Sequence, residues 1–266
     1  MIDYIKITQI MRSAGEIMKR ELKNCDIYVK GRADFVTETD LKVQEYIFSS
    51  LSVLYPQIGA VGEEQQTCID MDDKMCEVSD KDRVLQWILD PIDGTTNYIY
   101  GYNFSAISLA LKENDTIIWG AVYNPFTDEM FTAQRGEGAF LNEEPIHVSA
   151  KATLSDALIA VGTAPYHKEM ADEVFDKIKR LFKVGLDIRR TGSAALDLAY
   201  VAAGRQEVYF ENNLKIWDFA AGSLILQEAG GVVCDLAENA LQFEHNSDIV
   251  ACCNGEILKE VLKILK

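Results

Sequence analysis

The strand-rich stretch between residues 84 and 148 most constrains what this chain can fold into. It holds four short segments rich in β-branched, aromatic and aliphatic residues, separated by Gly, Asn and Pro. The middle two segments, "FSAISLALKE" and "TIIWGAVYNP", are joined through Asn114-Asp115, a dipeptide suited to a hairpin turn. We therefore expect antiparallel pairing in this part of the chain.

Helical patterns lie on both sides of this stretch. Apolar residues recur every three to four positions over residues 2–22 and 41–54, which predicts two amphipathic helices, with Thr39 or Asp40 as the N-cap of the second. Beyond residue 156, strand-like and helical runs alternate as far as Leu265. Strands followed by alternating strands and helices predict a layered α/β arrangement.

The charge of the chain limits its partners. Lys and Arg number 26 and Asp and Glu number 42, so the formal net charge is −16. Such a surface disfavours nonspecific binding to nucleic acid or to an anionic membrane. An anionic substrate would need positive charge from elsewhere, and a bound metal cation is the usual source.

The cysteines and apolar runs indicate a cytoplasmic protein. Six scattered cysteines include no CxxC pair and no zinc-like spacing with histidine, which favours a reducing compartment over a disulfide framework. No stretch approaches the roughly 20 apolar residues of a membrane span, and the first residues lack a signal-peptide pattern. Residues 65–83 are acidic and weakly periodic, and we expect an exposed loop or a loose hairpin there.

The stretch "WILDPIDGTTNY", residues 87–98, runs from an apolar strand directly into two carboxylates. Asp90 ends the strand, Asp93 follows across a turn with Pro91, and Gly94 begins a segment with free backbone N–H groups. Such N–H groups bind phosphate, and two adjacent carboxylates would repel it unless divalent cations lay between. Taken alone, the stretch also allows an aspartate that only caps a helix, with Gly94 serving the turn.

Two further acidic residues lie at the ends of predicted elements. Glu63 follows the apolar segment "IGAVG", and Asp218 follows Trp217 at the start of a long apolar helix. Individually, Glu63 suits a strand-end charge and Asp218 an N-cap. Together with Asp90 and Asp93 they offer oxygen ligands from three separate places, and ligation without histidine suits Mg²⁺ or Mn²⁺ rather than zinc.

At these residues the sequence resembles the inositol monophosphatase family. "GEE" at residues 62–64, "WILDPIDGTTNY" and "WDFAAGSLILQEAGG" resemble its three signature motifs, and "VKGRADFVTETD" and "RRTGSAALDLAYVAAG" resemble two further segments. The resemblance runs from about residue 5 to residue 260 and implies an αβαβα sandwich. It implies one domain over residues 1–266, with most metal ligands in residues 1–150 and with Asp218 and substrate contacts in residues 151–266.

The resemblance also implies a lithium-sensitive, Mg²⁺-dependent phosphomonoesterase that forms homodimers. Glu63, Asp90 and the Ile92 carbonyl would bind the cation that activates water. Asp90, Asp93 and Asp218 would bind a second cation near the leaving-group oxygen. Two or three Mg²⁺ ions are expected, and Mn²⁺ is expected to replace them.

Other residues acquire roles only through the resemblance. Thr95 would orient the attacking water with support from Asp40, and the Gly94 and Thr95 amides would bind phosphate. Five residues fall where relatives contact the substrate: Asp93, Ser193, Ala194, Glu211 and Asp218. Lys30 lies on the segment that resembles the mobile loop of the family.

Two segments leave the role of their side chains open. Tyr100-Gly101-Tyr102-Asn103 departs from the His-Gly-x-Pro-like segment of many relatives, and we expect these aromatic rings simply to pack. Arg189 and Arg190 precede "TGSAA". One of them faces a second phosphate, or they form salt bridges in a very acidic protein, and the residues alone do not choose.

The leading hypothesis is hydrolysis of inositol monophosphate or a related sugar phosphate by direct attack of water. Fructose 1,6-bisphosphate, histidinol phosphate, NADP(H) and 3′-phosphoadenosine 5′-phosphate are alternative substrates within the same chemistry. A non-catalytic regulatory protein on this scaffold would not need every ligand, so the full set of carboxylates argues against it. A two-metal nuclease fits the carboxylates but lacks a basic groove.

Overall fold

The computed structural model describes residues 2–22, 27–31, 34–64 and 84–266. The acidic stretch of residues 65–83, predicted as an exposed loop or a loose hairpin, lies outside these ranges. Within them, no helix is both long enough and apolar enough to cross a membrane. The three described cysteines, Cys234, Cys252 and Cys253, are buried and free.

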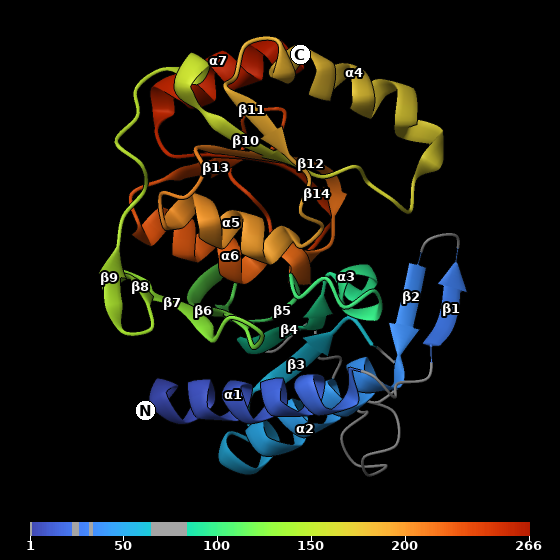
Figure 1. Ribbon diagram of the computed structural model, residues 1–266. Helices are drawn as coiled ribbons and strands as arrows, with labels where there is room; N and C mark the ends of the chain where they lie inside the picture. The colour runs from blue at the N-terminus through green and yellow to red at the C-terminus, as the bar shows by residue number, and fades with distance from the viewer. Residues whose placement is uncertain (1, 23–26, 32–33, 65–83) are drawn as a thin grey trace.

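The helices form three layers that alternate with two sheets (Figure 1). From one side of the molecule to the other, these layers are α1 (Tyr4–Glu21) with α2 (Glu38–Leu54), α5 (Ala194–Ala202) with α6 (Ile216–Glu228), and α4 (Ala171–Phe182) with α7 (Gly255–Leu265). A seven-stranded sheet separates the first two layers and a five-stranded sheet separates the last two. The expected αβαβα sandwich is confirmed.

The seven-stranded sheet follows chain order. Its strands are β3 (Gly59–Gly62), β4 (Leu85–Asp93), β5 (Ala106–Glu113), β6 (Thr116–Asn124), β7 (Glu129–Gln134), β8 (Gly138–Leu141) and β9 (Glu144–Ile146). Only β3 and β4 pair in parallel, and every later neighbour is antiparallel. The predicted hairpin through Asn114-Asp115 joins β5 to β6.

The five-stranded sheet mixes parallel and antiparallel pairs. In spatial order its strands are β11 (Asp187–Arg189), β10 (Leu158–Val161), β12 (Val208–Leu214), β14 (Ser247–Cys252) and β13 (Val232–Cys234). Three short elements complete the picture: the hairpin of β1 (Ile27–Gly31) and β2 (Asp34–Thr37), and the single turn α3 (Thr95–Ile99). Two 3₁₀ turns cover Leu154–Asp156 and Lys168–Met170.

The N-cap of α2 is Thr37, so the prediction of Thr39 or Asp40 is wrong. Thr37 is the last residue of β2 and keeps an extended backbone, while its hydroxyl accepts from the Asp40 N–H. Asp40 instead completes a capping box, because its Oδ2 accepts from the Thr37 N–H at 2.8 Å. The side chain of Asp40 is thereby fixed inside the protein, where it is fully buried.

Close packing fixes α6 against the seven-stranded sheet. A Cβ atom on Gly120 of β6 would lie 3.0 Å from the Ala221 backbone, so only glycine allows this approach. At the start of α6, the Ser108 hydroxyl of β5 donates to the Trp217 carbonyl at 3.0 Å. These contacts place Asp218, the next residue, beside the end of β4.

Candidate metal-dependent active site

An irregularity at the end of β4 brings its two aspartates to the same pocket. In a regular strand, residues three apart point to opposite faces. Here Asp90 pairs with Ser108 and Asp93 pairs with Ala106, so the register shifts between the two aspartates. A shift of this kind re-aims a side chain at the end of a strand. Both carboxylates consequently reach the same side of the sheet.

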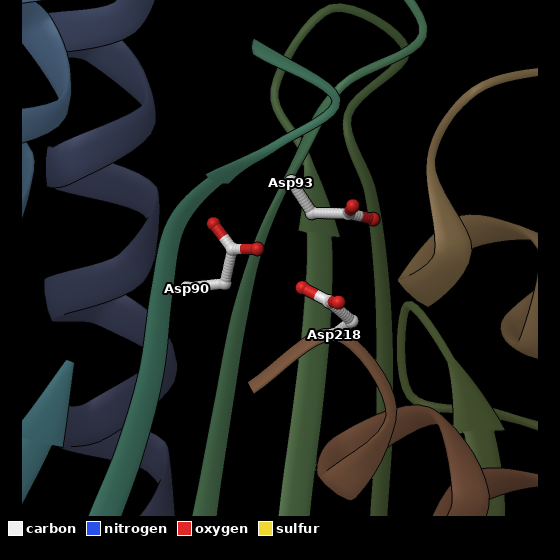
Figure 2. A group of neighbouring side chains, drawn as sticks. All are labelled: Asp90, Asp93 and Asp218. Atoms are coloured by element: carbon white, nitrogen blue, oxygen red, sulfur yellow. The ribbon is translucent and has the colours of Figure 1, made fainter. Parts of the chain in front are cut away.

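Asp218 joins these two aspartates from the first turn of α6. Each of the three residues offers an oxygen, and these atoms all lie within 4.8 Å of one another. Figure 2 shows the three carboxylates around one space, with Asp90 and Asp93 from β4 and Asp218 from the helix below. The structure thus brings together three of the residues that the sequence pointed to as ligands, and their binding of a cation stays a prediction.

The cluster lies in a pocket of about 680 Å³. Glu63 and Ile92 also line this pocket, although Glu63 is not one of the three residues with mutually close oxygens. Glu63 follows β3, and its N–H donates to the Leu89 carbonyl at 3.1 Å, which carries the β3–β4 pairing to the edge of the pocket. Gly94 and Thr95 form the adjoining wall.

The electrostatics of the cluster fit a cation. Burial raises the pKa of Asp90 well above its usual value, and the nearby charges of Glu63 and Asp93 raise it further. Burial likewise raises the pKa of Asp218, and the charges of Asp93 and Glu63 add to it. Ionising several close carboxylates costs free energy unless a positive charge lies between them. An all-oxygen donor set fits Mg²⁺ or Mn²⁺ as the source of that charge.

Asp93 also caps a helix, but not the one that follows it in sequence. Its carboxylate accepts from the Ser193 hydroxyl and from the N–H groups of Ala194 at 3.3 Å and Ala195 at 2.8 Å, at the start of α5. Burial raises the pKa of Asp93 to about 6, against the lowering effect of these hydrogen bonds. Capping and a place in the carboxylate cluster are therefore compatible in this residue.

Asp218 is not an N-cap either. Lys215 is the N-cap of α6, and Asp218 lies three residues further on, where its carboxylate accepts from the Lys215 N–H at 2.8 Å. The reason is that the chain stays extended through Lys215 and begins the helix there. This hydrogen bond orients the Asp218 side chain toward the pocket.

The turn after Asp93 is held by hydrogen bonds on several sides. The Thr95 hydroxyl lies 3.0 Å from the Ile92 carbonyl and 3.4 Å from Asp40 Oδ1. Gly94 has a φ of +87°, and a Cβ there would meet the Gly192 and Phe104 carbonyls at 3.0 and 3.1 Å. The predicted pairing of Asp40 with Thr95 thus has a geometric counterpart, and the turn requires glycine.

Asn97 ties this turn to the second half of the chain, a role that the sequence did not predict. Its Nδ2 donates to the Phe104 carbonyl at 2.8 Å and to the Thr191 carbonyl at 2.9 Å. Asn97 belongs to the quoted "GTTN" segment, yet a contact across 94 residues has no local sequence signal. It helps to align the turn after Asp93 with the loop that leads into α5.

The other predicted substrate contacts, Ser193, Ala194 and Glu211, come from the second half of the chain. Ser193 and Ala194 begin α5 and hydrogen-bond Asp93, as described above. Glu211 on β12 is buried and accepts from the Tyr209 hydroxyl at 2.7 Å and the Ala164 N–H at 3.1 Å. Burial raises the pKa of Glu211, whereas the charge of Arg190 lowers it. Glu211 and Ala194 line the pocket.

The structure places the backbone of Lys30 and shows the side chains of the segment after α3. Lys30 lies on β1, in the hairpin that stands beside α3 (Figure 1), and its side chain lies outside the described part of the chain. The expectation that Tyr100 and Tyr102 pack is wrong, because they are 81% and 66% exposed. The chain turns outward there, with positive φ at Gly101 and Asn103.

The structure separates the two arginines that the sequence left undecided. Arg189 on β11 forms an ion pair with Asp187 at 2.5 Å. Arg190 lines the pocket, and its guanidinium donates to the Thr163 hydroxyl at 3.3 Å. One arginine is thus structural, and the other borders the candidate site.

A second unpredicted feature is the buried carboxyl group of Asp197 in α5. The Thr191 hydroxyl donates to the Asp197 carboxyl group. Gln206 Nε2 lies 2.7 Å from the backbone carbonyl oxygen of Asp197 and 3.4 Å from its side-chain Oδ1. Burial raises the pKa of Asp197 to about 8, which outweighs those two hydrogen bonds. Asp197 thereby holds Thr191 in place, and the Thr191 carbonyl accepts the hydrogen bond from Asn97 Nδ2.

We expect Asp197→Asn to alter the pH dependence of stability. A raised folded-state pKa means that the native protein binds more protons than the unfolded chain, so the contribution of Asp197 to stability falls as pH rises from about 4 to about 8. The cost is at most roughly 1.4 kcal/mol per pH unit. We therefore expect the melting temperatures of Asp197→Asn and wild type, both measured in chelator, to diverge as pH rises. The stability of the variant relative to wild type should increase with pH.

The exposed turn residue Asp115 offers the matched control. Asp115→Asn makes the same chemical change without burial, so its melting curve should follow wild type across the pH range. Parallel curves for Asp197→Asn and wild type would contradict a neutral, buried Asp197.

Comparisons with known proteins agree with this geometry. The model of the inositol monophosphatase family matches residues 3–266. The inositol-1-monophosphatase of Rhizobium meliloti is 37% identical over 263 residues, which is 98% of this chain and 94% of that protein. The Nus factor SuhB of Vibrio cholerae is 39% identical over 244 residues, which is 90% of this chain and 87% of that protein.

A solved structure extends the likeness to three dimensions. The extragenic suppressor protein suhB from Bartonella henselae superposes with a TM-score of 0.88 at 38% identity, covering 99% of this chain and 98% of that one. The match of the family model over nearly the whole length, together with these relatives, places the protein: the chain belongs to the inositol monophosphatase family.

Proposed function

We propose that this protein is a Mg²⁺-dependent phosphomonoesterase that hydrolyses inositol monophosphate or a related sugar phosphate. The observation that carries the proposal is the convergence of Asp90, Asp93 and Asp218 within 4.8 Å in a pocket that Gly94 and Thr95 also line. Three close carboxylates attract divalent cations, and a cation beside a polar turn attracts a phosphate dianion.

The cation ligands are those that the family resemblance implies, and the closeness of Asp90, Asp93 and Asp218 supports one of the two sets. Asp90, Asp93 and Asp218 would bind one Mg²⁺, and Asp90, Glu63 and the Ile92 carbonyl would bind another. Mn²⁺ should replace Mg²⁺ because it accepts the same oxygen donors. When bound, two such cations supply positive charge to both the attacking and the leaving oxygens of an in-line displacement.

The remaining residues position the reactants. The Thr95 hydroxyl donates toward Ile92 or Asp40, which leaves its lone pairs free to accept a hydrogen bond from the attacking water. The Gly94 and Thr95 amides are assigned to the phosphate oxygens, and Glu211 to hydroxyl groups of the leaving alcohol. Water would attack phosphorus directly, so a chiral labelled phosphate should be released with inversion.

Hydrogen bonds to Asp93 already occupy the donors with which Ser193 and Ala194 would contact a substrate. Both groups already donate to Asp93, so a substrate oxygen would have to share these donors or follow the loss of a hydrogen bond. Glu211 keeps carboxylate oxygens at the pocket wall and is the stronger candidate for recognition of the alcohol.

A non-catalytic role is the main alternative, since a relative at 39% identity is named as a Nus factor. A protein that only bound a partner would not need the full set of Glu63, Asp90, Asp93, Thr95 and Asp218, and all five line one pocket. We therefore favour an enzyme, a phosphoric monoester hydrolase. The family resemblance and the scattered cysteines lead us to propose that it acts in the cytoplasm as a homodimer.

Phosphate release from a panel of phosphomonoesters tests the proposal. The panel holds inositol 1-phosphate, fructose 1-phosphate, histidinol phosphate, NADP and 3′-phosphoadenosine 5′-phosphate, each assayed with Mg²⁺, with chelator and with added Li⁺. We expect release with Mg²⁺, loss of release in chelator, recovery when Mg²⁺ is restored and inhibition by Li⁺. Release that survives chelation, or none from any member, would sink the proposal.

A further inference from the structure

Strand β12 carries two polar side chains that meet behind the wall of the pocket. Tyr209 and Glu211 lie two residues apart on this strand, so both side chains point to the same side of the sheet. The Tyr209 hydroxyl donates to Glu211 Oε2 at 2.7 Å. Glu211 lines the pocket, whereas Tyr209 is fully buried and does not line it. Tyr209 therefore contacts the carboxylate from within the protein and not from the pocket.

The ring of Tyr209 lies in an apolar environment. It belongs to a hydrophobic cluster with residues of α5 and α6 such as Leu198 and Leu224. Phenylalanine would fill such a position without a polar group, as Phe210 does on the opposite face of the strand. A buried hydroxyl costs free energy unless it forms a hydrogen bond, and Glu211 is its partner among the described contacts. The hydroxyl group of Tyr209 is thus explained by Glu211 and not by the packing of the ring.

Two residues after β10 fix the Glu211 carboxylate on its other sides. The Ala164 N–H donates to Oε1 at 3.1 Å, so each carboxylate oxygen has a donor. A Cβ atom on Gly162 would overlap the Glu211 carboxyl group, so glycine leaves the space that this group occupies. A carboxylate accepts about four hydrogen bonds, so one held in this way can still accept from hydroxyl groups of a ligand.

The same donors favour the charged form of Glu211. Burial raises the pKa of Glu211, and the hydrogen bonds from Tyr209 and Ala164 lower it. Burial raises the pKa of Tyr209 well above its usual value, and the charge of Glu211 adds to it, so the phenol keeps its proton and remains the donor. An ionised carboxylate accepts stronger hydrogen bonds from hydroxyl groups than a neutral acid does.

We propose that Tyr209 is a positioning residue for recognition of the leaving alcohol: its hydroxyl holds the Glu211 carboxylate in the orientation that accepts hydrogen bonds from hydroxyl groups of that alcohol. This inference rests on the proposed phosphatase function and deepens it. Because Tyr209 does not line the pocket of the carboxylate cluster, its loss should weaken binding of the alcohol and leave the chemical step unchanged.

Tyr209→Phe in the intact enzyme with Mg²⁺ tests the proposal on two substrates. The leaving alcohol of inositol 1-phosphate has several further hydroxyl groups, and that of p-nitrophenyl phosphate has none. We expect KM for inositol 1-phosphate to rise about tenfold and kcat to change by less than about twofold, because a hydrogen bond to a charged group is lost. Both constants for p-nitrophenyl phosphate should stay within about twofold of wild type.

Glu211→Gln shows whether Tyr209 acts through the carboxylate. That substitution should itself raise KM for inositol 1-phosphate, and adding Tyr209→Phe to it should cause no further rise, because residues that act through one interaction are not additive. A further rise of about tenfold in the double variant would show that Tyr209 acts independently of Glu211 and would overturn the proposal.

Tyr123→Phe is the matched control. Tyr123 is a buried tyrosine of β6 whose hydroxyl donates to Asp128 Oδ1 at 2.9 Å, and it does not line the pocket. Its replacement should leave KM for both substrates at the wild-type values. Should Tyr209→Phe fail to fold, Gly162→Ala displaces the Glu211 carboxyl group by another route and should raise KM for inositol 1-phosphate in the same way.

The two substrates separate failure of this proposal from failure of the proposed function. Unchanged constants in Tyr209→Phe, or an equal rise in KM for both substrates, would overturn the positioning role. Wild-type enzyme that releases phosphate from neither substrate would instead contradict the proposed function itself.

Discussion

Replacing Asp90 with asparagine is expected to lower Mg²⁺-dependent phosphate release by about 10³-fold or more. Asp90 is the central carboxylate of the cluster, because its charge interacts with Glu63, Asp93 and Asp218. Asparagine keeps the shape, including the oxygen that accepts from the Ile92 N–H at 3.0 Å, but removes the negative charge. Steady-state phosphate release at saturating Mg²⁺ measures the effect.

The same substitution should stabilise the cation-free protein. Burial and neighbouring carboxylates raise the pKa of Asp90, so ionising it at neutral pH costs stability that asparagine does not lose. In chelator we expect the variant to be more stable than wild type by about 1–2 kcal/mol and to melt a few degrees higher. Added Mg²⁺ should stabilise the variant less than it stabilises wild type. Asp115→Asn, in an exposed turn, should match wild type in both measurements. Unchanged turnover in Asp90→Asn would contradict the site.

Gly94→Ala is expected to lower stability by about 2–4 kcal/mol and turnover by about 10²-fold. The backbone there has φ +87°, and the new Cβ would lie 3.0 Å from the Gly192 carbonyl and 3.1 Å from the Phe104 carbonyl. Both neighbours are backbone and cannot rotate away. The turn would have to move, and with it Thr95 and the adjacent end of β4. Urea denaturation and phosphate release measure the two effects.

Gly136 supplies the matched control for that substitution. It has a similar φ of +82°, but a Cβ there would meet nothing within 4 Å. Gly136→Ala should therefore cost only the left-handed backbone strain, about 1 kcal/mol, and leave turnover unchanged. Equal losses in the two variants would mean that crowding at Gly94 contributes nothing and that the turn is not a rigid part of the site.

Local patterns in the sequence predicted the elements, and chain-wide contacts decided the rest. Helical spacing foretold α1 and α2, and Asn114-Asp115 foretold the β5–β6 hairpin, because both signals act over a few residues. The N-cap of α2 was misplaced by two or more residues, since β2 runs directly into the helix. The exposure of Tyr100 was not foreseen, because Gly101 and Asn103 allow a turn there but do not show whether that turn faces the core or the solvent.

The candidate site divides in the same way. Glu63, Asp90, Asp93 and Asp218 were identified because each lies at or near one end of a predicted element, and the resemblance assigned them to one site. The capping of α5 by Asp93 was not foreseen, because the contact spans 100 residues. The support of Thr191 by Asp197 was also missed, since an aspartate within a helix of small residues gives no sign of a neutral, buried carboxyl group.

Anomalous diffraction from crystals grown with Mn²⁺ tests the central claim most directly. The claim is that Asp90, Asp93 and Asp218 together bind a divalent cation. The expected anomalous difference map shows a strong peak among their carboxylate oxygens, and that peak disappears in Asp90→Asn crystals. A map with no peak there, from an enzyme that Mn²⁺ nevertheless activates, would contradict the account.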